Sequence, residues 1–403
     1  MKTNDLSPQL AEKLLEDLRK GIPPVGRLEL LTVGRNEEIE WLDNHLGDEE
    51  AHALLLKANY GSGKSHLLQL LREKALRECF AVSLVTLDAK SGVRFNRMDQ
   101  IFGQILRHIE IQMDDGSIGG LSQLLDYFAA CAVEAESEPG TESHDFWKSV
   151  TNNWRWDYSE ELESPPLFIA FRAWAKSDCQ DVKDTIIDWL TSPDNYKSQR
   201  SLLYTKLVEN LRGSFRDPRP TYQMYSEGCL TFIPQLYAAC WSALEDINRM
   251  CRITGLNGMA ILFDEFEDVL TNLVRVNWQE AAFWNLFRFV SGIRFSGKTF
   301  FAVTPSFVEK CKCCLIERDR WDIDLGEFDA LPYFEMSPLT KKDLFQLAER
   351  IVEVHELAYD YEVDESVLQD MYASVALAAK SAVQDRARQA IRRAVEILDD
   401  ALD

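Results

Sequence analysis

Residues 58–65 read ANYGSGKS, a glycine-rich loop that ends in a lysine and a serine. The preceding residues 53–58, ALLLKA, form a short apolar run of the kind that makes a buried strand. The following residues 66–71, HLLQLL, begin a segment with leucines at helical spacing. Strand, glycine-rich loop and helix is the order that a phosphate-binding P-loop requires. The alternative is a flexible turn that carries a surface lysine, and the flanking strand and helix argue against it.

The composition of this loop predicts its ligand. Glycines let consecutive backbone N–H groups point at phosphate oxygens, and the start of the following helix adds its positive dipole end. Lys64 is then expected to reach the β- and γ-phosphates of ATP, and the Ser65 hydroxyl to bind Mg²⁺. A small residue, Ala58, stands where such loops usually have their first glycine. The predicted nucleotide-binding residues are Ala58, Asn59, Tyr60, Gly61, Ser62, Gly63, Lys64, Ser65 and His66.

A second motif lies about two hundred residues downstream, where residues 258–270 read GMAILFDEFEDVL. An apolar strand that ends in Asp264-Glu265 places two carboxylates at the carboxyl end of a parallel sheet, where ligands bind in open α/β folds. Asp264 is expected to hold Mg²⁺ through its water shell, and Glu265 to orient and deprotonate the water that attacks the γ-phosphate. Glu267 is the next candidate for that base. The motif is weak alone and strong together with the P-loop.

Further catalytic candidates come from the end of the third expected strand and from arginines. Thr304 ends the run TFFAVT and is a candidate sensor of the γ-phosphate; the alternative is a strand-end threonine that bonds to backbone. Arg388, in the last helical segment, could reach back from a lid to stabilise developing charge. Arg318 and Arg320 could do so across a subunit boundary. For all three arginines the alternative is a solvated surface position.

Composition limits the class of protein. The chain has 403 residues, 46% of them hydrophobic, which is enough for a large core and two to three domains. Its net charge of −22 argues against autonomous high-affinity binding to nucleic acid. The cluster at Cys311, Cys313 and Cys314 lacks the second pair that a zinc site needs. The first residues carry charges throughout and no run is long enough to cross a membrane, so we expect a cytoplasmic protein with no membrane partner.

The pattern along the chain predicts an α/β fold of P-loop NTPase type, with a parallel sheet flanked by helices. Between residue 110 and about residue 228 the sequence shows no strand alternation, so we predict a helical insertion there. The expected parts are an N-terminal helix with the first part of the ATPase core (1–109), the insertion (110–228), the second part of the core (229–336) and a C-terminal helical lid (337–403).

Individual elements are expected from periodicity and capping signals. Thr340 is expected to cap the first helix of the lid. The other expected helices are 7–20, one after Gly34-Arg35, 97–111, 229–253 and 278–293, and the other expected strands are 80–89, 299–305 and 333–337.

Together these stretches resemble the BREX-system ATP-binding proteins of bacterial anti-phage defence, within the wider AAA+ and STAND-like P-loop ATPases. The stretch at 337–359 is the most specific, because a generic P-loop protein has no reason to contain it. The stretches that carry the resemblance are EDLRKGIPP, YGSGKSHLL, ILFDEFEDVL, AVTPSF and SPLTKKDLFQLAERIVEVHELAY.

The resemblance implies several further features. The strand before Thr304 should lie between the P-loop strand and the Asp264 strand, and a C-terminal helical lid should follow. Gly34-Arg35 looks like the box that packs near adenine in related ATPases. The protein should work beside other anti-phage defence proteins. The sequence departs from the pattern at Ala58 and by the lack of a proline before Arg388.

Three functions are compatible with a P-loop and an Asp-Glu pair. The first is an ATPase that drives or times assembly of a multi-protein anti-phage complex on DNA. The second is a nucleotide-gated scaffold with little turnover, which would not need the base at Glu265. The third is a small-molecule kinase, against which the lid and the Asp-Glu pair argue. The sequence leaves open the identity of the partners, whether the chain forms a homo-oligomer, and whether DNA is bound directly or through partners.

Overall fold

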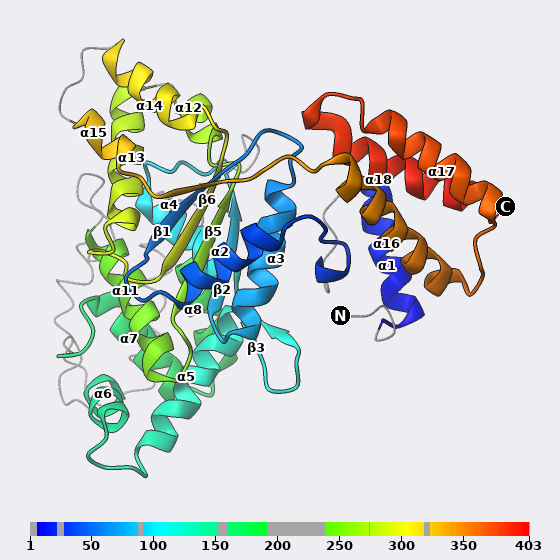
Figure 1. Ribbon diagram of the computed structural model, residues 1–403. Coiled ribbons are helices and arrows are strands. Elements are labelled where there is room, and N and C mark those ends of the chain that lie inside the picture. The colour runs from blue at the N-terminus through cyan, green and yellow to red at the C-terminus, as the bar shows by residue number, and fades with distance from the viewer. Residues whose placement is uncertain are drawn as a thin grey trace.

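The computed structural model describes residues 6–21, 28–87, 92–151, 159–191, 238–273, 275–317 and 323–402. Within these residues one sheet of seven strands lies between helices, with the strand order β4-β3-β2-β5-β6-β1-β7 (Figure 1). The strands from β2 to β7 in this order are parallel, and β3 and β4 add an antiparallel edge. The strands are β1 (Ala53–Lys57), β2 (Ala81–Thr86), β3 (Ile109–Gln112), β4 (Ile118–Gly119), β5 (Met259–Asp264), β6 (Lys298–Val303) and β7 (Tyr333–Glu335). The predicted helix-flanked sheet is therefore present, and it is parallel except at the β3–β4 edge, which the prediction of a parallel sheet did not include.

Both faces of the sheet are buried, which explains why its central strands read as unbroken apolar runs. Leu54 and Leu56 of β1 belong to the core on one face, under the helices α2 (Asn36–Gly47) and α3 (Lys64–Arg77). Leu55, between them, belongs to the core on the opposite face. Successive side chains of a strand point to opposite faces, so a strand buried on both needs apolar residues at every position.

The strand order confirms the expectation that the Thr304 strand lies between the P-loop strand and the Asp264 strand. β6 pairs with β1 on one side and with β5 on the other, in parallel. In this register Lys57 pairs with Val303, and Phe263 pairs with Phe301. The glycine-rich loop, Asp264 and Thr304 therefore leave the sheet at the same edge.

The segment after residue 108 differs from the expectation in its first part. It contains β3 and β4, which extend the sheet, so the prediction of no strands from residue 110 onward was wrong. The helix expected at 97–111 is α4 (Met98–Arg107) and ends earlier, where β3 begins. β3 and β4 have four and two residues, too few for alternation to stand out from the flanking helices. The strand expected at 80–89 is β2, which ends at Thr86.

Helices of the predicted insertion pack on the sheet rather than beside it. Their buried aromatic residues, among them Phe128, Trp147 and Phe171, share one continuous core with Phe263 of β5 and Phe301 of β6. The helices of this part are α5 (Leu121–Ala135), α6 (Glu142–Thr151), α7 (Pro165–Lys176) and α8 (Gln180–Thr191). The end of the predicted insertion, from residue 192 to residue 228, and the first part of the helix expected at 229–253 lie outside the described residues.

The second half of the sheet region adds the remaining helices of the core. The helix expected at 278–293 is α13, and the second part of the one expected at 229–253 is α11. These helices are α11 (Ala238–Ile253), α12 (Asp268–Asn272), α13 (Val276–Val290), α14 (Phe307–Ile316) and α15 (Leu325–Asp329).

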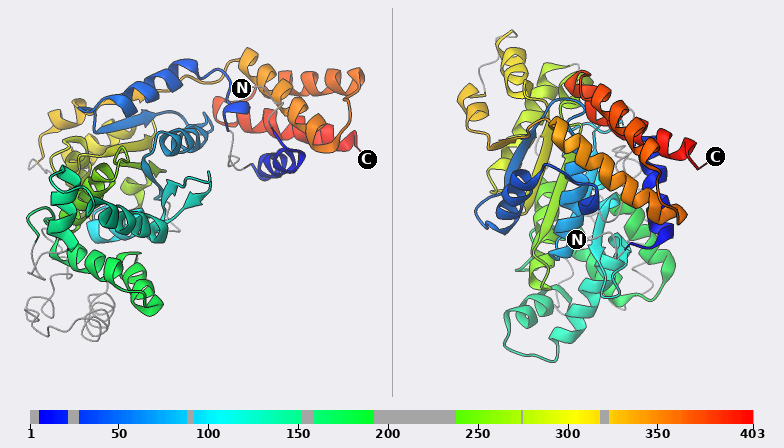
Figure 2. Two further views of the ribbon diagram at one scale, coloured as in Figure 1. Left: turned by 90° about the horizontal axis from the view of Figure 1, so that it is seen from below. Right: turned by 45° about the vertical axis from the view of Figure 1, so that its right-hand side comes forward.

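The C-terminal residues form helices α16 (Lys341–Tyr359), α17 (Glu365–Ala378) and α18 (Val383–Asp400), as expected. Thr340 caps α16 in a capping box with Asp343. The first helix, α1 (Pro8–Lys20), lies against α16 and α18 and shares their separate apolar core (Figures 1 and 2). The domain boundaries at 109, 228 and 336 stay predictions, and α1 packs with the lid.

Candidate nucleotide-binding site

The loop between β1 and α3 has the backbone conformation of a phosphate cradle. Gly61 has φ +72° and Gly63 has φ +93°, a left-handed region that side chains with a Cβ atom rarely adopt. Gly63 is the N-cap of α3, and Lys64 is its first residue. The loop therefore delivers its ligand to the positive end of a 14-residue helix.

Lys64 is buried in this loop, with 9% of its surface exposed. Its ammonium donates hydrogen bonds to the carbonyl oxygens of Ala58 at 2.9 Å and Asn59 at 3.4 Å. It also lies 4.0 Å from the Glu267 carboxylate. Burial lowers the pKa of Lys64, and the negative charge of Glu267 acts in the opposite direction. The positive charge is thus held where the loop would receive phosphate.

The two predicted carboxylates follow β5 directly. Asp264 is half-buried, and its Oδ1 accepts a hydrogen bond from the Glu265 N–H at 2.9 Å. Glu265 is exposed and has φ +55°, a left-handed conformation that is uncommon for a residue with a side chain. Because the chain turns sharply at Glu265, the next residue, Phe266, enters the core, and Glu267 returns to the loop side. Strained conformations of this kind cluster at functional sites.

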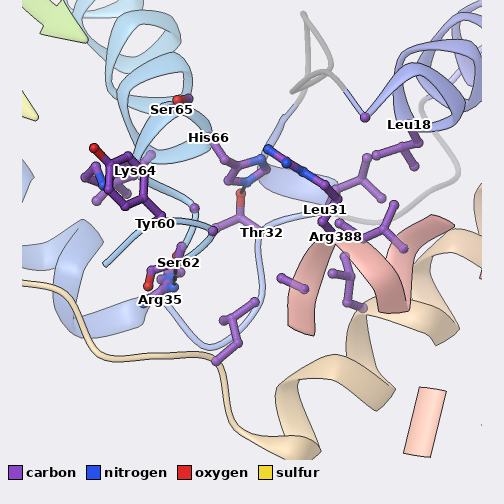
Figure 3. Close-up of a pocket in the computed structure, with 18 of the residues that line it drawn as sticks. Leu18, Leu31, Thr32, Arg35, Tyr60, Ser62, Lys64, Ser65, His66 and Arg388 are labelled. Atoms are coloured by element: carbon purple, nitrogen blue, oxygen red, sulfur yellow. Dashed lines mark hydrogen bonds between the residues drawn. The ribbon is translucent and has the colours of Figure 1, made fainter. Parts of the chain in front are cut away.

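A cavity of about 600 Å³ joins these groups to the C-terminal helices. Figure 3 shows Lys64, Tyr60 and Ser65 on its sheet side, and Leu18, Leu31 and Arg388 on its lid side. Its wall also includes Arg19 and Lys20 of α1, Leu347 of α16, and Ile391 and Arg392 of α18. The sheet-side end of the cavity is therefore polar, and the lid-side end combines apolar side chains with cations.

Most of the predicted site residues meet in this one cavity. Those that line it are Tyr60, Gly61, Ser62, Gly63, Lys64, Ser65, His66, Arg35, Asp264, Glu265 and Arg388. Ala58, Asn59, Gly34 and Thr304 are not part of its wall. Arg318 and Arg320 lie outside the described residues, so the fingers expected there stay predictions.

Thr304 lies just beyond β6, the strand between the loop and Asp264. It is buried, and its hydroxyl has no hydrogen-bond partner among the described residues. The alternative in which this hydroxyl bonds to backbone is thus not what the structure records. A buried hydroxyl without a partner at this edge of the sheet is suited to form a hydrogen bond with a ligand or a water molecule.

Arg35 connects the glycine-rich loop with the start of the lid. Its guanidinium donates hydrogen bonds to the carbonyl oxygen of Ser62 at 2.7 Å and of Ser337 at 2.5 Å. It also pairs with Glu38 at 2.7 Å, and both side chains are buried. Arg35 lines the cavity, as expected of a residue near adenine, but its donors are occupied by protein oxygens. Its position favours bracing the loop over direct contact with a base.

His66 is fixed in one tautomer by its neighbour. Thr32 donates its hydroxyl proton to the Leu28 carbonyl oxygen at 2.8 Å. The same hydroxyl oxygen lies 2.8 Å from His66 Nε2, so it accepts a hydrogen bond from the N–H of that nitrogen. Burial, and then the charge of Arg35, lower the pKa of His66 to about 4. A neutral histidine therefore ties α3 to the segment that leads into α2.

Several residues of the site had no signal in the sequence. Glu267 was named there as a substitute base, not as the partner of Lys64. The lid-side wall, with Leu339, Leu347 and Ile391, depends on packing between distant segments. The sequence predicted the lid helices themselves, with Thr340 as the cap of α16, but not which of their side chains face the cavity.

No group of three or more metal-ligating His, Cys, Asp or Glu side chains is found in the part of the chain that the structure describes. Cys311 is buried on α14 and Cys313 is exposed on the same helix. The described helices also include none long and apolar enough to cross a bilayer. A Mg²⁺ ion bound by Ser65, Asp264 and phosphate oxygens would need no such cluster, and the unpartnered Thr304 hydroxyl and Glu267 Oε2 at the same end of the sheet fit a site built for further polar groups.

Comparison with known proteins identifies the family. The model of the family described as BREX system ATP-binding protein BrxC/D matches residues 6–204, which include the glycine-rich loop. The chain belongs to the BREX ATP-binding family. Membership confirms the resemblance seen in the sequence and implies ATP binding within anti-phage defence. No curated protein and no solved structure matches the chain.

Proposed function

We propose that this BREX-family protein binds and hydrolyses ATP with Mg²⁺. The observation that carries the proposal is the convergence of Lys64, Asp264 and Glu265 on one cavity. These residues come from two separate loops, which follow β1 and β5, with β6 between them. A loop that merely binds an anion would need Lys64 and the helix dipole, but no carboxylates.

Each residue has a role in the proposed reaction. The left-handed loop and the start of α3 bind the phosphates through backbone N–H groups, and Lys64 neutralises their charge. Ser65 and Asp264 are the residues that would hold Mg²⁺, which neutralises phosphate charge when bound. Glu265, exposed in the cavity, accepts the proton of the attacking water. Thr304 positions that water or the γ-phosphate, and Arg388 approaches from α18.

The cavity size and lining also support a nucleotide. A cavity of about 600 Å³ is in the range of cofactor-sized ligand sites. Its apolar end, with Leu31, Leu347 and Ile391, suits a purine ring, and its opposite end suits phosphates. The AAA+ assignment rests on the lid of α16, α17 and α18, of which α16 and α18 line the apolar end of the cavity.

The work done with ATP belongs to the same proposal. We propose that turnover drives or times assembly of a multi-protein anti-phage complex on DNA, in the cytoplasm. The family supports other defence-system proteins as partners. The net charge of −22 favours contact with DNA through those partners over tight binding by this chain.

Two substitutions test the function. Lys64→Ala removes the buried ammonium and should abolish ATP binding in a folded protein. Glu265→Gln keeps the shape of the side chain but cannot accept a proton, so it should bind ATP normally and lose about 10²–10⁴-fold in turnover. Calorimetric ATP binding and phosphate release, with and without DNA, are the measurements.

Two results would count against the proposal. Unchanged ATP affinity in folded Lys64→Ala protein would exclude the loop as the phosphate site. Equal, very slow phosphate release from the wild type and Glu265→Gln would favour the nucleotide-gated scaffold over the ATPase.

A further inference from the structure

Glu267 lines the cavity and has no role in the reaction proposed above. Its neighbour Phe266 packs in the core, with ring centroids 4.7 Å from Phe95 and 4.6 Å from Phe301. The Phe266 N–H donates to the Ala302 carbonyl oxygen of β6 at 3.2 Å. Glu267 is itself the N-cap residue of α12. The core therefore sets the position of the Glu267 backbone, from which the side chain reaches Lys64.

The charges around Lys64 make Glu267 its partner in the structure. Lys64 and Glu267 are 9% and 8% exposed, and the ammonium lies 4.0 Å from Glu267 Oε1. The hydrogen bonds of Lys64 go to the uncharged carbonyl oxygens of Ala58 and Asn59. Glu267 thus neutralises a buried charge that would otherwise be costly.

The Lys64–Glu267 ion pair leaves one carboxylate oxygen without a hydrogen bond, so a better partner for Lys64 can replace Glu267 easily. Glu267 Oε2 is buried and has no hydrogen-bond partner among the described residues. Besides Lys64, the Glu267 carboxylate interacts with its own backbone N–H and with Tyr60, which belongs to the glycine-rich loop and is 59% exposed. The Tyr60 ring also lies 4.9 Å from the Lys64 ammonium. Movement of the glycine-rich loop therefore changes the contacts of Glu267 with Lys64 and with Tyr60 together.

We infer that Glu267 is the counter-ion of Lys64 when no nucleotide is bound, and that the phosphates of a nucleotide must displace it. A phosphate on Lys64 would bring a second anion to the ammonium that Glu267 already neutralises. The displaced carboxylate then lies next to that phosphate and to Asp264, and like charges at this range repel strongly in a buried site. Glu267 thereby weakens nucleotide binding and speeds nucleotide release. This inference rests on the proposed function, because it assumes that phosphate contacts Lys64.

The test is Glu267→Gln, which keeps the size of the side chain and removes its charge. Equilibrium affinity and dissociation rate are measured with ADP, with ATP and with inorganic pyrophosphate, at one Mg²⁺ concentration. We expect about tenfold tighter binding of each, mostly through slower release. The matched control is Asp268→Asn, which removes one negative charge at the next residue and should change affinity by less than about twofold, because Asp268 does not line the cavity and charges farther from the phosphates are better screened.

The outcomes separate this inference from the proposed function. Wild-type binding with unchanged or weaker affinity in folded Glu267→Gln protein would overturn the inference and leave the function intact. Unchanged affinity with lost turnover would also overturn it and would make Glu267 a catalytic carboxylate. An equal gain in nucleotide affinity in Asp268→Asn would show that net charge alone causes the effect, and would overturn the inference. Absence of nucleotide binding by wild type and variant alike would overturn both.

Discussion

Gly34 lies so close to Asp343 that a Cβ atom on the glycine would overlap the aspartate carboxyl group. Gly34 has φ +61°, and the Asp343 carboxylate accepts hydrogen bonds from the N–H and the hydroxyl of Thr340 at 2.7 Å each. The turn before α2 therefore packs directly on the cap of α16. Since Arg35 follows Gly34, one short turn connects the glycine-rich loop, α2 and the lid.

Gly34→Ala should weaken this junction. The new methyl group meets Asp343, and the left-handed backbone adds strain, so we expect a loss of about 1–3 kcal/mol in the free energy of unfolding. Urea unfolding measures the loss, and limited proteolysis near residues 337–343 reports whether the lid loosens. The matched control is Gly47→Ala on α2, because a Cβ atom there meets nothing within 4 Å. Equal stability of the two variants would contradict the described contact.

Arg35→Met should lower both stability and nucleotide affinity. It leaves the Glu38 carboxylate buried without its partner, at a cost of about 3–5 kcal/mol, and it frees the Ser62 carbonyl oxygen of the loop. The double variant Arg35→Met/Glu38→Met removes the stranded charge and should recover most of the stability. We expect its ATP affinity to stay low, because the loop is still unbraced. Recovery of affinity together with stability would show that Arg35 acts through folding alone.

The glycine-rich loop and the central strands could be predicted because their signals are local, whereas the strand order was implied by the family resemblance. ANYGSGKS lies next to an apolar strand and a leucine helix, and each central strand is a continuous apolar run. The pairing of Glu267 with Lys64 could not be predicted, since it depends on the left-handed turn at Glu265 and on Phe266 entering the core. The contact of α1 with α16 likewise depends on apolar faces that fit many partners. Short strands such as β3 are hidden by the helices around them.

Leu14→Ala should destabilise the lid and not the sheet. Leu14 is fully buried in the core that α1 shares with α16 and α18, and the cavity left by the substitution should cost about 2–5 kcal/mol. Hydrogen exchange should become faster in α1, α16 and α18, and stay slow in β1, β5 and β6. The control is Leu68→Ala, on α3 in the core between α3 and the sheet. It should speed hydrogen exchange in β1, β5 and β6 and leave α1, α16 and α18 unchanged. Uniform acceleration by both variants would indicate one cooperative unit.

The protein should lose stability in mild acid through His45. Burial, and then the charge of Lys298, lower the pKa of His45 to about 4 from an ordinary value of 6.5. Between these two values the unfolded chain binds a proton that the folded chain excludes, so this stability is complete above the ordinary pKa and is lost as pH falls toward about 4. The loss is at most about 3 kcal/mol. His45→Phe, which keeps a ring beside Trp41 and Phe300, should flatten the urea-unfolding profile over this range. An unchanged slope would contradict a buried, neutral His45.

The packing of α1 on the C-terminal helices also has a consequence for synthesis of the chain. Arg19 of α1 hydrogen-bonds to Asp399 of α18, 380 residues later. At about 5–20 residues per second, a ribosome needs about 20–80 seconds to add that many residues. During most of this time the apolar face of α1, with Leu14, Leu15 and Leu18, lacks its partners on α16 and α18, while the glycine-rich loop and β1 have already emerged. Helix α1, which leaves the ribosome well before the helices that it packs on, is thus among the last elements to fold, and for this interval it presents a binding site for chaperones.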